Sequence, residues 1–124
     1  MTLIAVFVGG LVGTGLRLGL DALLPQGDDG FPLSTLLINT AGSFALGLLV
    51  ARLWPTARPW LRAALGPGLL GSFTTFSAVV ASVFTLTTAG DGLLAAGYLA
   101  ATLVLGFAAA FAGLRLGART EAAA

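Results

Sequence analysis

The groups in this chain that could do chemistry are mostly hydroxyls, and they gather in the stretch GSFTTFSAV at residues 71–79. This stretch lies inside an apolar segment, residues 60–89, which is longer than the roughly 20 residues that a membrane-spanning helix needs. Pro67 and several glycines come just before it; proline removes a backbone donor, and glycine weakens a helix. We therefore expect a helix break near residues 71–75, whose unpaired carbonyls could hold a bare monovalent cation.

Two phenylalanines in the same stretch, Phe73 and Phe76, indicate a second kind of site. An aromatic ring has a negative face and a positive edge, so a ring presented edge-on can stabilise a small anion without a formal charge. The polar patch ends early, because Ser77 is followed by the apolar residues Ala78 and Val79. The stretch thus combines a candidate cation site with a candidate anion site.

A few further polar positions lie within the other apolar segments. Asn39 is in the middle of the second segment, where its amide offers two donors to an anion but would serve equally well to join helices. Tyr98 and Thr102 are four residues apart, so on a helix their hydroxyls share one face. Arg17 lies within the first segment, where it could snorkel, pair with Asp21 at i+4, or draw anions into an aqueous vestibule.

The residue types most used for catalysis and metal binding are missing. The sequence contains no cysteine, histidine or lysine, which removes disulfides, thiolate and imidazole metal ligands, and Schiff-base chemistry. No acid–base pair is left, so we expect no enzymatic activity. No Asp or Glu occurs in the second, third or fourth apolar segment, which argues against a small proton-coupled drug exporter, because that class needs a buried carboxylate.

The elements that must position these residues are membrane-spanning helices. The chain has 124 residues, of which 57% are hydrophobic and 9% are charged, against about 25% charged residues in a typical soluble domain. Each of its four apolar segments is long enough to cross about 30 Å of hydrocarbon. We predict an all-α membrane protein in which residues 1–124 form a single domain, with spans running roughly over residues 3–24, 31–54, 60–89 and 92–114.

The placement of the arginines predicts how the spans are oriented. With four spans, the two termini and the second loop share one side of the membrane, and this side carries Arg52, Arg58, Arg62, Arg115 and Arg119. The loops on the opposite side carry only acidic residues, namely Asp28, Asp29 and Asp91. Even if Arg17 is counted on that opposite side, the positive-inside rule predicts that both termini are cytoplasmic.

The chain resembles the Fluc (CrcB) family of fluoride channels in three motifs from three different spans, GGLVGTGLR at 9–17, FPLSTLLINTAGSFALG at 31–47 and GSFTTFSAV at 71–79. Members of that family are passive, fluoride-selective channels of the bacterial plasma membrane, which export fluoride from the cytoplasm and so lower its toxicity. Two four-helix subunits pack in opposite membrane orientations and form two pores, with a sodium ion at the centre of the dimer.

The resemblance also implies roles for individual residues. Carbonyls of Gly71 and Thr74 would hold the sodium ion at the break in the third helix, and Arg17 would be the vestibule arginine. The fluoride pore would be lined by Asn39, Phe76, Ser77, Tyr98 and Thr102.

Several positions depart from the family pattern. The usual TTFSTF reads TTFSAV here, so Ala78 replaces a hydroxyl and Val79 replaces the second pore phenylalanine. Ser72 stands where glycine is common, and Gly106 stands where the hydroxyl track of the fourth span usually continues. These changes remove polar or aromatic partners that a dehydrated anion would need.

The arginine bias conflicts with an antiparallel homodimer, because such a dimer needs copies of one chain in both orientations. We therefore expect this chain to pair with a paralogous four-helix subunit of opposite bias in preference to itself. The alternatives are a non-conducting scaffold subunit of such a heterodimer and, more remotely, a small multidrug exporter.

Overall fold

The computed structural model describes residues 1–24 and 32–123, with side chains described through residue 118. Its regular structure is helical throughout, in the order α1 (Thr2–Leu23), α2 (Leu33–Arg52), α3 (Pro59–Ala63), the π-helical segment η1 (Ala64–Leu70), α4 (Gly71–Phe73), α5 (Phe76–Thr88) and α6 (Gly92–Ala123). Four stretches are long and apolar enough to cross a membrane: Thr2–Leu23, Leu33–Arg52, Pro59–Thr88 and Gly92–Ala118. The predicted all-α architecture with four spans is confirmed for this part of the chain.

Some predictions fall outside the described residues. They concern the acidic loop residues Asp28 and Asp29, the start of the second expected span at Phe31, and the side chain of Arg119. That the whole chain forms a single domain stays a prediction.

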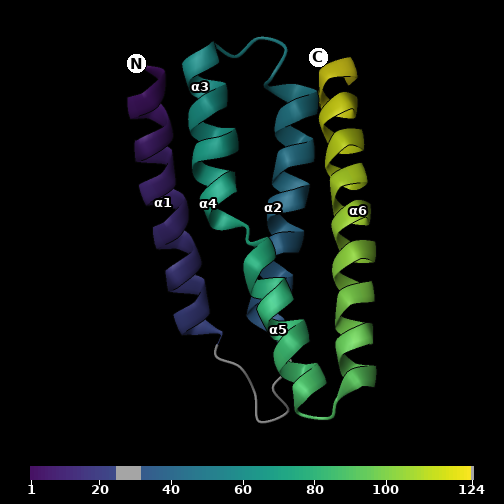
Figure 1. Ribbon diagram of the computed structural model, residues 1–124. Coiled ribbons are helices and arrows are strands. Elements are labelled where there is room, and N and C mark those ends of the chain that lie inside the picture. Colours follow the sequence, from purple (N-terminus) through teal and green to yellow (C-terminus); the bar gives the residue numbers. More distant parts are fainter. Residues whose placement is uncertain (25–31, 124) are drawn as a thin grey trace.

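The spans run side by side, with both termini and the α2–α3 connection at one end (Figure 1). The α5–α6 connection lies at the opposite end, so neighbouring spans are antiparallel, as short connections require. α2 packs chiefly against α6, and α1 packs chiefly against η1. The third span is therefore held beside α1 in its first half and beside α6 in its second half.

Glycines allow these helices to approach each other closely. A Cβ atom at Gly9 would collide with the Ala64 carbonyl, and one at Gly13 would collide with the Leu69 carbonyl, so α1 lies directly on the backbone of η1. Gly47 and Gly113 bring α2 and α6 together in the same way, through contacts with backbone of the facing helix. Small residues take these places because no hydrophobic force drives helices together in lipid.

The glycines Gly15 and Gly19 on α1 behave differently. Nothing in the described residues lies within 4 Å of a Cβ position built on Gly15 or Gly19. Among the described residues, this pair therefore does not pack two helices together, although its spacing is the same as that of Gly9 and Gly13.

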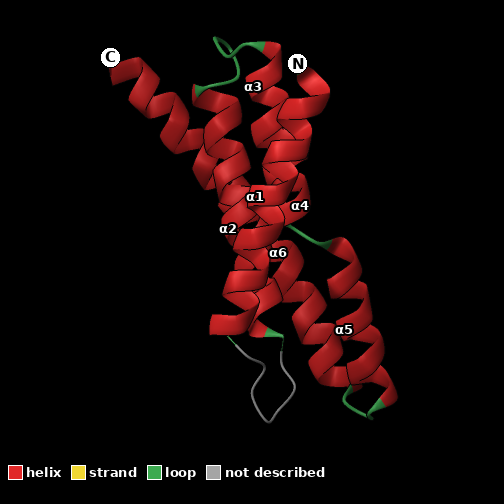
Figure 2. Ribbon diagram, turned by 90° about the vertical axis from the view of Figure 1, so that its left-hand side faces the viewer, coloured by secondary structure: helices red, strands yellow, loops and turns green. Residues whose placement is uncertain are grey.

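The third span is broken, as the sequence predicts. Pro67 lies in η1, and the Gly71 N–H bonds back to the Gly66 carbonyl five residues earlier, which is the π-helical pattern. The chain then becomes extended at Thr74 (φ −81°, ψ 157°) and at Thr75 (φ −149°, ψ 121°). α5 begins again at Phe76, displaced sideways from α4 (Figure 2).

The apolar side chains are distributed as expected for a protein surrounded by lipid. Few are buried, and they form two small clusters: Leu36, Val79, Leu86, Ala95 and Tyr98 in one, and Ile38, Leu70 and Phe73 in the other. Many large ones are exposed on every span, among them Phe7, Leu11, Phe84 and Val104. Small residues thus make the helix contacts, and large residues face outward.

Candidate functional site

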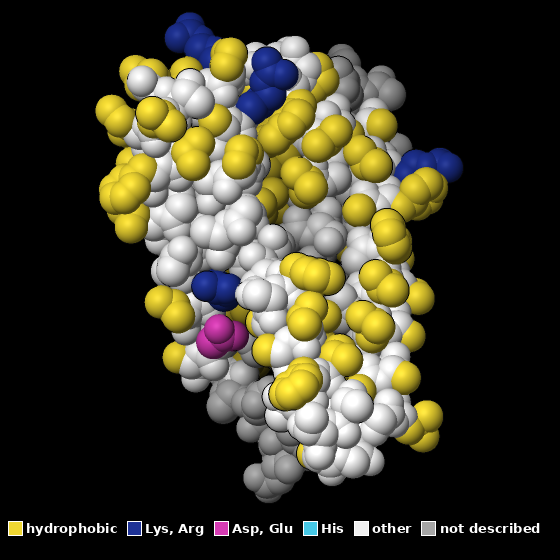
Figure 3. Space-filling model, viewed as in Figure 1, with side chains coloured by type: hydrophobic (Ala, Val, Ile, Leu, Met, Phe, Trp, Pro, Cys, Tyr) yellow, Lys and Arg dark blue, Asp and Glu magenta, His cyan; other side chains and the backbone are white. Residues whose placement is uncertain are grey.

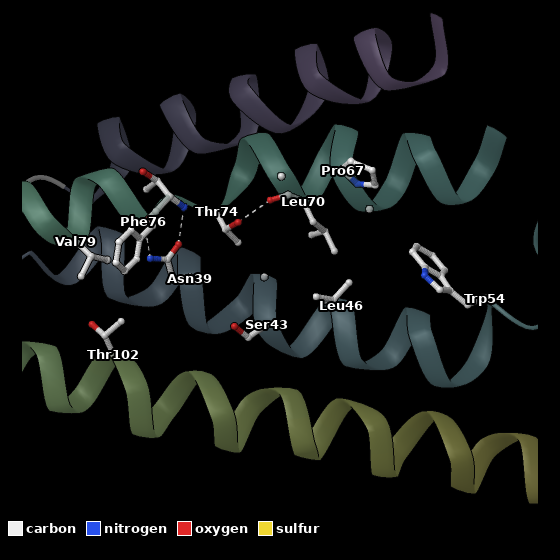
Figure 4. A pocket seen from close by; sticks show the side chains of 14 residues that line it. Asn39, Ser43, Leu46, Trp54, Pro67, Leu70, Thr74, Phe76, Val79 and Thr102 are labelled. Carbon is white, nitrogen blue, oxygen red and sulfur yellow. Dashed lines mark hydrogen bonds between the residues drawn. The ribbon is translucent and has the colours of Figure 1, made fainter. Parts of the chain in front are cut away.

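The helix break faces a groove between α2, the third span and α6, with a volume of about 540 Å³ (Figure 4). Five of the eight predicted site residues line this groove: Asn39, Gly71, Thr74, Phe76 and Thr102. The other three, Arg17, Ser77 and Tyr98, are not among its lining residues. The structure therefore brings together residues from three spans that are far apart in the sequence.

Asn39 is bound to the backbone of the break. Its Nδ2 donates to the Thr75 carbonyl at 2.9 Å, and the Thr75 N–H donates to Asn39 Oδ1 at 2.8 Å (Figure 4). One amide side chain thus satisfies both polar backbone groups of a residue that has left the helix. Of the two amide donors considered in the sequence, one N–H is left for a ligand.

Two hydroxyls complete the local hydrogen bonding at the break. Thr75 Oγ1 accepts the Ala78 N–H at 3.2 Å, which caps the start of α5, and it lies 3.2 Å from Ser77 Oγ. Thr74 Oγ1 donates back to the Leu70 carbonyl at 2.8 Å. Both threonines of the motif therefore stabilise the break itself.

The carbonyls predicted to bind a cation have lost their helical partners. In a continuous helix the Gly71 carbonyl would accept the Thr75 N–H, and the Thr74 carbonyl would accept the Ala78 N–H. These two N–H groups donate instead to Asn39 and to Thr75 Oγ1. No hydrogen bond within the described residues reaches either carbonyl oxygen. Gly71 is exposed and Thr74 is half-buried, so the pair suits an oxygen-coordinated cation.

The two positions of the phenylalanine motif both line the groove but differ in exposure. Phe76, the first residue of α5, is 78% exposed at the edge of the groove. Val79 is 2% exposed and packs in the cluster with Leu36 and Tyr98. One ring is therefore free to meet a ligand or a partner, whereas the valine fills the core of its own subunit.

On α6, the hydroxyl oxygens of Tyr98 and Thr102 are both buried. Thr102 lines the groove, and Tyr98, one turn earlier, is fully buried at 0% exposure. A smaller hollow of about 240 Å³ continues past Thr102 and is lined by Ser43 and Gly106 among others. Ser43 lies one turn beyond Asn39 on α2 and lines both spaces. It is not among the predicted site residues, although its i+4 spacing from Asn39 indicates a shared face.

Arg17 is separate from the groove. It is half-buried on α1, and its Nε atom is enclosed with no hydrogen-bond partner in the part of the chain that the structure describes. Asp21 does not pair with it; the Asp21 carboxylate instead accepts a hydrogen bond from Ser34 on α2. Among the alternatives open in the sequence, the Arg17–Asp21 ion pair is not formed.

Comparison with known proteins shows which family the chain resembles over most of its length. Residues 4–114 match the family described as "CrcB-like protein, Camphor Resistance (CrcB)". A protein of Paracoccus denitrificans named "Fluoride-specific ion channel FluC" is 41% identical, covering 94% of this chain and 94% of its own length. A protein of the same name from Deinococcus radiodurans is 43% identical over 90% of this chain and 91% of its length. "Fluoride-specific ion channel FluC 2" of Geobacillus kaustophilus is 39% identical over 91% and 90%. Given that the match runs through all four spans and the broken third helix, the chain belongs to the CrcB-like (Fluc) family.

Proposed function

We propose that this protein is a subunit of a passive fluoride channel, which lets fluoride leave the cytoplasm and so lowers its toxicity. The observation that carries the proposal is the groove at the helix break. It offers an Asn39 N–H, the Ser43 hydroxyl and the exposed Phe76 ring, with Thr102 in its wall, and no charged side chain is among its lining residues. The relatives named as fluoride-specific channels support the choice of ion.

The groove suits a small anion that must pass without being trapped. Dehydrating such an ion is costly, so each lost water must be replaced by a donor or by the positive edge of a ring. Conduction also requires that the ion be released, and neutral groups bind it less tightly than an arginine in the groove would. No enzymatic step is part of this proposal.

We further propose that the conducting unit is a dimer of antiparallel subunits, with a paralogous chain as the preferred partner. The five-arginine bias supports this, because it disfavours insertion in both orientations. Two relatives, from Geobacillus kaustophilus and Nocardia farcinica, carry the name "FluC 2", a numbering that fits organisms with more than one such chain. The open groove beside the exposed Phe76 is the face that a second subunit would cover.

Within that dimer, a sodium ion would be held by the Gly71 and Thr74 carbonyls. The loss of their helical hydrogen bonds supports this assignment. The ion would supply positive charge at the subunit contact. We place the protein in the bacterial plasma membrane with both termini in the cytoplasm.

A non-conducting scaffold role is the second candidate, and the burial of Val79 favours it. A valine within the core offers an anion no aromatic edge, so the pore served by this position has lost a partner. A small multidrug exporter fits less well, because spans two to four contain no carboxylate.

Reconstitution in liposomes tests the function and the partner together. We expect fluoride efflux from vesicles that contain this chain with its paralogue, and little efflux from this chain alone. Chloride-loaded vesicles serve as the control for selectivity. Robust efflux from a dimer containing only this chain would contradict the heterodimer, and absence of efflux from the mixed sample would contradict the channel.

A further inference from the structure

We propose that Asn39 is a positioning residue for the cation site: it keeps the Gly71 carbonyl open by taking the N–H that this carbonyl would otherwise accept. The inference rests on the proposed sodium site and assigns Asn39 a role in addition to contact with the transported anion. It joins two features, the amide on α2 and the break in the third span, that are 36 residues apart.

The hydrogen-bond register of the third span changes at the break. The last helical bond before the break runs from the Thr74 N–H to the Leu70 carbonyl at 2.9 Å. The next bond of a regular helix would join the Thr75 N–H to the Gly71 carbonyl. That N–H donates to Asn39 Oδ1 at 2.8 Å instead. The helical hydrogen bonds therefore stop at Leu70, and the Gly71 carbonyl keeps its acceptor site open.

Removing the Asn39 amide has a cost at the break. The Thr75 carbonyl has its hydrogen bond from Asn39 Nδ2, and the two bonds together hold this residue extended. Away from water, backbone groups without partners are strongly disfavoured. Without Asn39, the nearest remedy for the Thr75 N–H is to rejoin the helix at the Gly71 carbonyl, which removes a cation ligand.

α2 approaches the break closely. A Cβ atom on Gly42, one turn beyond Asn39, would collide with Thr74 Cγ2. The absence of that Cβ lets the extended residues lie against α2, where the short Asn39 side chain can reach them. The amide and the glycine therefore belong to one arrangement, which sets the position of Thr74 and Thr75.

The test measures the response to sodium separately from transport. In the assembled channel, we would measure the sodium concentration that gives half-maximal protection against thermal dissociation, with N-methylglucamine as the replacing cation. Asn39→Leu removes both hydrogen bonds, and we expect this concentration to rise at least tenfold. Asn39→Asp keeps an acceptor for the Thr75 N–H, so it should retain the sodium response while losing fluoride efflux. If Asn39→Leu does not assemble, Asn39→Ala replaces it, with the same expectation.

Thr40→Val is the matched control. It removes the polar side chain next to Asn39, and among the described residues the Thr40 hydroxyl makes no hydrogen bond to the break. Its sodium response should equal that of the unsubstituted protein. An unchanged half-maximal concentration in the Asn39→Leu or Asn39→Ala channel would overturn the inference and leave the sodium site standing. If the unsubstituted channel shows no response to sodium, the site and the inference are both overturned.

Discussion

Phe76 and Val79 lie one turn apart on α5, and their surroundings decide what each can contribute. The Phe76 ring is 78% exposed at the groove, so its positive edge is available to an anion. Val79 is 2% exposed and packs with Tyr98, so a ring at this position would first have to displace core side chains. At this scale, the loss of the second phenylalanine is accommodated by the packing of the subunit itself.

The contribution of the Phe76 ring can be measured by removing its aromatic character. Phe76→Ile keeps an apolar side chain without a positive edge, and we expect fluoride efflux to fall by about tenfold or more, equivalent to roughly 1.4 kcal/mol in the barrier. Phe84→Ile is the control, since Phe84 is on the same helix, is 68% exposed and does not line the groove. Efflux that falls equally in both variants would rule out a specific role for Phe76.

At the scale of the element, the third span depends on α1 for its shape. Gly9 and Gly13 lie on the backbone of η1, and Ser72 Oγ is 3.0 Å from the Gly10 carbonyl and 2.8 Å from the Gly68 carbonyl. Ser72, which stands where the family pattern commonly has glycine, therefore links α1 to the segment just before the break. The π-helical turn and the break are supported from one side by α1 and from the other by Asn39 on α2.

This support predicts different effects for two glycines on α1. A Cβ at Gly13 would collide with the Leu69 carbonyl and Ser72 Oγ, so Gly13→Ala should lower the free energy of unfolding by about 1–3 kcal/mol. Gly15→Ala places its Cβ where no other part of the described structure lies within 4 Å, and the gain in helix propensity should leave stability unchanged or raise it by up to about 1 kcal/mol. Thermal unfolding in detergent compares the two. Equal melting temperatures would contradict the close packing of α1 on η1.

At the scale of the whole molecule, charge is distributed unevenly along the membrane normal. Figure 3 shows an apolar surface with basic side chains mainly toward the end where the termini lie. Arg52, Arg58 and Arg62 follow the same distribution along the chain, because they flank the α2–α3 connection at that end. Such a bias favours a single orientation in the membrane.

Reporter fusions at the C-terminus test that orientation. We expect a cytoplasmic reporter to be active and a reporter that needs the opposite side to be silent. Replacing Arg52, Arg58 and Arg62 by glutamine should give a mixed population, because these residues carry most of the bias. A mixed population in the unsubstituted chain would contradict the predicted orientation and weaken the case for a paralogous partner.

The sequence by itself determined that the chain lies in a lipid bilayer, that it has four spans and that the third span is broken. These follow from composition, from the length of apolar runs and from Pro67 and its neighbouring glycines, all of which act locally along the chain. The family motifs also predict that Phe76 and Asn39 are site residues, and both line one groove.

Only the tertiary structure decided what the polar side chains bind. Whether Asn39 binds an anion or the backbone depends on α2 lying against the broken helix, a contact between residues 36 positions apart. The same reason explains why Asp21 accepts a hydrogen bond from Ser34 instead of pairing with Arg17, and why Gly13 packs closely while Gly15 contacts no other helix among the described residues. Residue type and spacing specify what a side chain can do, and the neighbouring helix selects which of those contacts is made.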